Sequence, residues 1–141
     1  MPKKINFIQI TLLFILFTLA EGCQSHTTAI EKNLSPAEYF QLARDATVEG
    51  NYRLALAYYE SFIDQYNSNH HRNEIHRLLW ADYEIAFLHH KMNNDEKAID
   101  LLNKLIARYE TDDSDNYPIG PKNLSLRVIT ELNLSQKSTS E

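Results

Sequence analysis

The sequence predicts an all-α protein built from a short row of antiparallel helical hairpins. Its 141 residues include only three glycines and four prolines, too few turn residues for an all-β fold. Apolar side chains recur at spacings of three and four residues, which is the period of an amphipathic helix. One such pattern also returns 43 residues later in the chain. The length suits one small domain.

The first helix begins at Pro36. Ser35 precedes it as N-cap, and Glu38, three residues after the serine, completes a capping-box pattern. Gly50 and Asn51 are predicted to end the helix, because glycine readily adopts the left-handed backbone conformation of a helix C-terminus.

A second amphipathic stretch follows this short turn. Two helices joined so closely must lie antiparallel, as a hairpin. The small and apolar residues of the second stretch, at helical spacing, are Leu54, Ala55, Tyr58, Tyr59, Phe62, Ile63 and Tyr66.

The same order of residues returns further along the chain, with Asn93-Asn94 at the turn. Five pairs share one offset of 43 residues, which makes an internal repeat. The pairs are Ala43 and Ala86, Ala55 and Ala98, Phe62 and Leu105, Ile63 and Ile106, and Tyr66 and Tyr109.

Each copy resembles the tetratricopeptide repeat. The family's small residues fall on both helices of each hairpin, where bulkier side chains would hold the helices apart. The glycine before the turn occurs in the first copy, and the aromatic residue of the second helix is a leucine in the second copy. The positions that carry the resemblance are Ala43, Gly50, Ala55, Tyr59, Ala86 and Ala98.

The spacing of 43 residues exceeds the family period of about 34. We therefore expect extra residues near positions 67–73. The predicted domain covers residues 36–134, with repeats at about 36–69 and 79–112 and a capping helix at about 121–133. Residues 111–121 are predicted to form a loop, and residues 135–141 a disordered tail.

Residues 1–22 read as a signal peptide, with Lys3 and Lys4 before an apolar run too short to span a bilayer. Cys23, the only cysteine, ends the segment Leu-Ala-Glu-Gly-Cys, which resembles a bacterial lipobox. The resemblance implies lipidation of Cys23, export, and anchoring to the cell membrane or outer membrane. Cleavage by the ordinary signal peptidase and a retained anchor remain alternatives. Residues 23–35 are expected to be a flexible tether.

The sequence offers little sign of chemistry. The histidines at positions 70, 71, 76, 89 and 90 lack the spacing of a helical metal pair, and no further ligand pattern accompanies them. We therefore predict neither a metal, nor another cofactor, nor catalysis. The net charge of −5 argues against a nucleic-acid partner.

The resemblance implies an adaptor that binds envelope proteins or peptides, and the layout also looks like that of the lipoproteins of outer-membrane β-barrel assembly. Tyr52 and Trp80 are candidate contact residues, because tyrosine and tryptophan are enriched at binding hot spots. Packing of Trp80 between hairpins is the alternative. A second hypothesis is a structural subunit that self-associates, since a stack of two repeats leaves an end uncovered.

Overall fold

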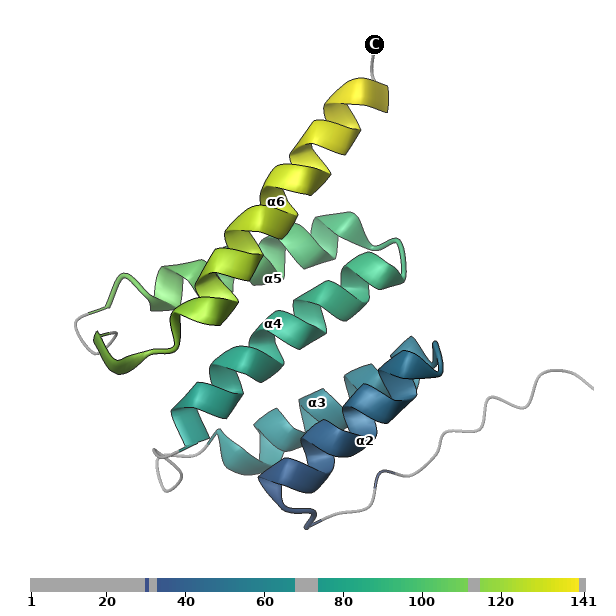
Figure 1. The fold of residues 1–141 in the computed structure, drawn as a ribbon, viewed down its shortest axis with the longest axis vertical. Coiled ribbons are helices and arrows are strands. Elements are labelled where there is room, and N and C mark those ends of the chain that lie inside the picture. The colour runs from purple at the N-terminus through teal and green to yellow at the C-terminus, as the bar shows by residue number, and fades with distance from the viewer. Residues whose placement is uncertain (1–29, 31–32, 68–73, 112–114, 140–141) are drawn as a thin grey trace, which may run out of the picture.

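The computed structural model describes residues 30, 33–67, 74–111 and 115–139. Within these ranges it contains helices and no strand, so the predicted all-α fold class is confirmed. Two antiparallel hairpins are followed by one long helix that crosses the second hairpin (Figure 1). The helices are α2 (Pro36–Val48), α3 (Tyr52–Tyr66), α4 (Ile75–Lys91), α5 (Asp95–Arg108) and α6 (Ile119–Thr139).

Local sequence explains the ends of the helices. The Ser35 hydroxyl accepts a hydrogen bond from the backbone N–H of Glu38, and the Glu38 carboxylate accepts one from the N–H of Ser35 at 2.8 Å. This is the predicted capping box. Both hairpin turns use a left-handed residue: Gly50 has φ +75° and Asn93 has φ +60°. Asparagine is among the few other residues that tolerate this conformation.

The two hairpins pack through small side chains. Ala43 on α2 and Ala55 on α3 are fully buried, as are Ala86 on α4 and Ala98 on α5. A methyl group is the largest side chain that allows two helix backbones to approach closely. α4 also packs on α3, which joins the two hairpins in one stack.

Two adjoining cores result. The first gathers residues of α2, α3 and one side of α4, and the second gathers residues of the other side of α4 with α5 and α6. Their large buried side chains include Tyr39, Tyr59, Phe62 and Leu88 in the first, and Leu79, Leu102, Leu105 and Leu132 in the second.

The capping helix is longer than predicted. α6 begins at Ile119 and includes Pro121 in its first turn. Proline is tolerated there because its missing N–H would have no hydrogen-bond partner within the helix. It continues to Thr139, so the prediction of a disordered tail from residue 135 is wrong as far as residue 139. The Ser135 and Ser138 hydroxyls each donate to a carbonyl of the preceding turn, which lets serine fit a helix.

The signal segment, Cys23 and the predicted extra residues at 68–73 lie outside the described residues. In the part of the chain that is described, none of the helices combines the length and the apolarity that crossing a membrane requires.

Candidate functional site

The face of α4 that lies between α2 and α6 is the first candidate site. Figure 1 looks onto the side of the molecule where α2 and α6 stand in front of α3 and α5, with α4 running between them. Trp80, Glu84, Phe87 and Lys91 are spaced by four, three and four residues, so they share one face of this central helix. We call these four residues the α4 face. Lys91 is exposed and the other three are half-buried.

Aromatic contacts order this face. The Phe87 ring stacks on Tyr83 with the ring centroids 6.0 Å apart, and Trp80 meets Tyr83 edge-on at 6.1 Å. The Lys91 ammonium lies 5.1 Å from the centroid of the Phe87 ring, a cation–π geometry. The α4 face therefore presents the ordered Phe87 ring beside the positive charge of Lys91.

Charged groups of both neighbouring helices border the face. Burial raises the pKa of the Glu84 carboxyl, and the charge of Arg44 on α2 opposes that shift. On α6, Arg127 pairs with Glu131 at 2.9 Å, and both charges act on the pKa of Tyr83, which burial raises. The α4 face thus lies between a cation from α2 and an ion pair from α6.

The structure places the two predicted contact residues differently. Trp80 belongs to the α4 face, but its indole also packs on α6 at Gly120. A methyl group added at Gly120 would lie 2.8 Å from the Trp80 ring, so this close packing requires glycine. Tyr52 opens α3 and packs, half-buried, on the first core. Tyr52 and Trp80 therefore do not form one site.

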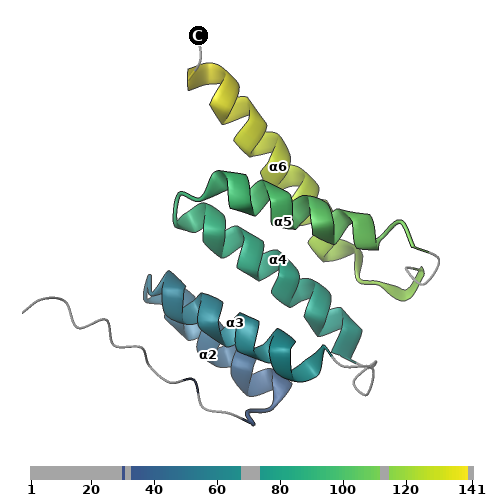
Figure 2. The ribbon, with the colours of Figure 1, turned by 180° about the vertical axis from the view of Figure 1, so that it is seen from behind.

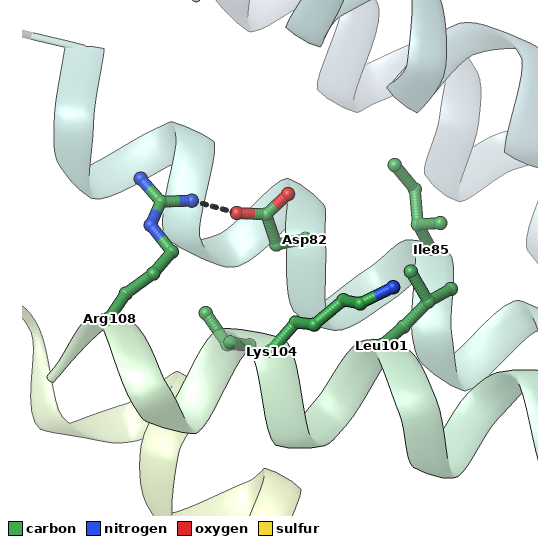
Figure 3. A pocket seen from close by; sticks show the side chains of 6 residues that line it. Asp82, Ile85, Leu101, Lys104 and Arg108 are labelled. Atoms are coloured by element: carbon green, nitrogen blue, oxygen red, sulfur yellow. Dashed lines mark hydrogen bonds and ion pairs between the residues drawn. The ribbon is translucent and has the colours of Figure 1, made fainter.

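A pocket lies on another side of α4, facing α5. Figure 2 shows the molecule from behind, with α3, α4 and α5 side by side. The pocket has a volume of about 280 Å³. Side chains of α4 and α5 converge on it (Figure 3). Its lining consists of Asp82, Ile85, Leu101, Lys104, Leu105 and Arg108.

The charges at the rim of this pocket already have partners. Arg108 donates a hydrogen bond to the Asp82 carboxylate, as the dashed line in Figure 3 marks. Burial raises the pKa of Asp82, and the charge of Arg108 opposes that shift. Lys104 donates to Asp100 at 2.8 Å. Because these pairs satisfy both cations, the pocket is a weaker candidate than the α4 face.

The described histidines do not gather as metal ligands. His76 is exposed, and His90 lies 2.7 Å from the Asp95 carboxylate. His89 is half-buried, and its Nδ1 is buried without a hydrogen-bond partner among the described residues. Over the described ranges, no three His, Cys, Asp or Glu side chains come together in a metal-binding group. His70 and His71 lie outside those ranges.

Sequence reasoning missed Phe87, Glu84 and Lys91 as members of the candidate site. Their spacing from Trp80 was a usable signal, because it places all four on one face of the predicted helix. The missing information was which side of that helix the other described elements leave uncovered.

Comparison with known families supports this architecture. Residues 80–111, which cover most of α4 and all of α5, match the tetratricopeptide repeat family. Comparison with curated proteins and with solved structures gave no match. The four positions of the α4 face fall within the matched segment. The second hairpin of this chain is therefore similar to a tetratricopeptide repeat.

Proposed function

We propose that the protein is a membrane-tethered adaptor that binds another protein of the cell envelope through the α4 face. Tetratricopeptide repeats generally act as protein-interaction modules, and the family match includes this face. The observation that carries the proposal is the half-exposed Phe87 ring, stacked on Tyr83 and capped by Lys91.

The chemistry of the α4 face suits a peptide segment with an apolar side chain and an acidic neighbour. The apolar side chain would pack against the Phe87 ring, whose position Tyr83 already fixes. An ordered aromatic loses little conformational entropy on binding, so more of its buried area contributes to affinity. The acidic neighbour would pair with the exposed ammonium of Lys91.

The membrane tether is the second part of the proposal. It is supported by the lipobox-like segment that ends in Cys23 and by the apolar run before it. Several acyl chains, at about 0.8 kcal/mol per buried methylene, would hold the protein durably at a membrane. Residues 23–35 would then let the hairpins reach a partner near the surface. A role in outer-membrane protein assembly is the narrower form of this proposal.

Site-specific photo-crosslinking tests the binding face. A photo-reactive phenylalanine analogue at position 87 of the full-length chain should give a discrete adduct with a partner protein in intact cells. The same analogue at exposed Glu96, on the second helix of the hairpin, is the matched control and should give none. Adding Lys91→Glu should weaken the adduct at position 87 severalfold. Equal adducts at both positions, or an adduct indifferent to Lys91→Glu, would contradict the assignment.

The tether is tested separately with Cys23→Ala. This variant should lose acyl labelling and leave the membrane fraction after an alkaline wash, whereas the parent chain should remain. If both chains stay equally bound to the membrane, the lipid anchor is wrong and an uncleaved segment replaces it. The crosslinking result at position 87 does not depend on this outcome.

A further inference from the structure

We infer that α6 is a self-association surface, on which the α6 helices of two copies pair antiparallel about Thr130. Large hydrophobic side chains left in solvent on this helix motivate the inference. Ile119 is 60% exposed, Leu126 is 47% exposed and Leu134 is 64% exposed. Scattered surface leucines need no explanation, but these three lie on one helix at spacings of seven and eight residues, so they form one stripe.

The stripe lies opposite the face that α6 buries. Val128 and Leu132 pack into the second core, and Ser125 is fully buried, its hydroxyl donating to the Pro121 carbonyl. At 100° per residue, the direction of these side chains lies about half a turn from Thr130, the exposed residue between Leu126 and Leu134. Among the described residues, α6 therefore has one face packed on the core and one face without a packing partner.

The architecture indicates what the unpartnered face lacks. α2 pairs antiparallel with α3, and α4 with α5, whereas α6 follows α5 without a second helix of its own in the described part of the chain. A further helix running antiparallel to α6 would complete a third hairpin-like pair. An α6 from a second copy, related by a two-fold axis, has this direction.

The residue positions fit such a pair. Thr130 stands midway between Leu126 and Leu134, so a two-fold axis beside Thr130 places each Leu126 next to Leu134 of the second copy. Thr130 then lies at the point of closest approach, where a small side chain favours contact. The last described turns of α6 extend beyond the body of the protein, leaving room for a second copy (Figure 1).

The charges beside the stripe are self-complementary. In the antiparallel pair, Arg127 lies within about one helical turn of Glu131 of the second copy, measured along the helix axis. The two-fold symmetry creates this ion pair twice. Within one chain, Arg127 and Glu131 already pair at the surface, so both charges lie on the side of the helix that the contact needs. Lys122 would approach Lys137 of the second copy. Its ammonium, however, lies over the Tyr109 ring of its own chain, 5.7 Å from the ring centroid.

Cysteine crosslinking tests the pairing. In a full-length Cys23→Ser background, Thr130→Cys would be the only cysteine. Mild oxidation should convert most of this chain to a disulfide dimer, since the axis brings the two sulfurs together. Glu96→Cys, on exposed α5 surface, should give at least fivefold less dimer. Leu134→Lys should lower the yield at position 130 to that of the Glu96→Cys control.

Charge reversal adds a rescue. Arg127→Glu and Glu131→Arg should each lower the crosslink at position 130 severalfold, because each places like charges across the axis. The double reversal should restore it. These side chains are exposed, so the fold survives each change, and circular dichroism checks this. A Thr130→Cys chain that crosslinks no better than Glu96→Cys, or whose crosslink ignores Leu134→Lys and charge reversal, would overturn the inference.

Discussion

The first hairpin is packed around aromatic rings, whereas the second is packed around leucines. In the first, the Phe40 ring lies 5.2 Å from both Tyr59 and Phe62, measured between centroids. In the second, the positions equivalent to Tyr59 and Phe62 are Leu102 and Leu105, both buried. The two hairpins are alike in their fully buried alanines and in the left-handed residue at each turn. The comparison indicates that the small contact residues and the turn, rather than the kind of large core residue, set the hairpin geometry.

The largest expected effect comes from truncating the matched core residues. Phe62→Ala should lower the free energy of unfolding by about 4 kcal/mol and Leu105→Ala by about 3 kcal/mol, because each leaves a cavity in a fully packed site. Urea unfolding followed by circular dichroism measures both. Val48→Ala, at an exposed position, is the control and should cost under about 1 kcal/mol. If Phe62→Ala lowered the free energy of unfolding no more than this control, the aromatic core would not be what stabilises the first hairpin.

The turns should respond to backbone conformation alone. Gly50 has φ +75°, and a methyl group there would meet no atom within 4 Å. Gly50→Ala should therefore cost about 1.5 kcal/mol through left-handed strain. Gly50→Asn should cost much less, because Asn93 adopts the same conformation in the second hairpin. Equal losses for the two variants would show that asparagine is not an adequate substitute at this turn.

The first helices of the two hairpins begin differently, so substitutions at their N-caps should differ in their effect on stability. Ser35 caps α2 through a reciprocal pair of bonds with Glu38, whereas Glu74 makes no capping bond at the start of α4. Ser35→Ala should lower the free energy of unfolding by about 1 kcal/mol. Glu74→Ala should change it by only a few tenths of a kcal/mol, since it removes a single ion pair with the half-exposed Arg77 side chain. Similar losses at both positions in thermal unfolding would contradict this difference.

The smallest effect concerns Glu84, whose pKa burial raises. The folded state therefore holds the proton more tightly than the unfolded chain, and stability falls as pH rises through this titration. Glu84→Gln should leave the Tm unchanged near pH 3, where the carboxyl is protonated in both states, and raise it slightly at pH 7. A Tm increase independent of pH, or a decrease at pH 7, would show that the carboxylate is not destabilising.

Local signals predicted most of the fold. Ser35, Glu38 and Gly50 marked the bounds of α2, and the alanines 43 residues apart identified the matched hairpin positions. The end of α6 was not predictable in this way. Residues 133–138 are exposed and polar apart from Leu134, a composition that suits a solvated helix as well as an unstructured tail.

The candidate site was predicted only in part. Trp80 was predicted as a candidate contact residue, with packing between the hairpins as the alternative. Its packing on Gly120 depends on where α6 crosses α4, which local pattern does not specify. Phe87 and Glu84 read as ordinary positions on an amphipathic helix. What makes them a candidate site is their position on the side of α4 that lies between α2 and α6. Tertiary arrangement, rather than residue type, selects these positions.

The small contact residues give the most direct test of the architecture. Ala55→Leu and Ala98→Leu should each lower the free energy of unfolding by about 3 kcal/mol, because three more carbon atoms must fit into a fully buried contact. Ala107→Leu, an exposed position on the same helix as Ala98, is the matched control and should change it by under about 0.5 kcal/mol. If thermal unfolding gave the same Tm for Ala98→Leu and Ala107→Leu, the close approach of paired helices would not hold this fold together.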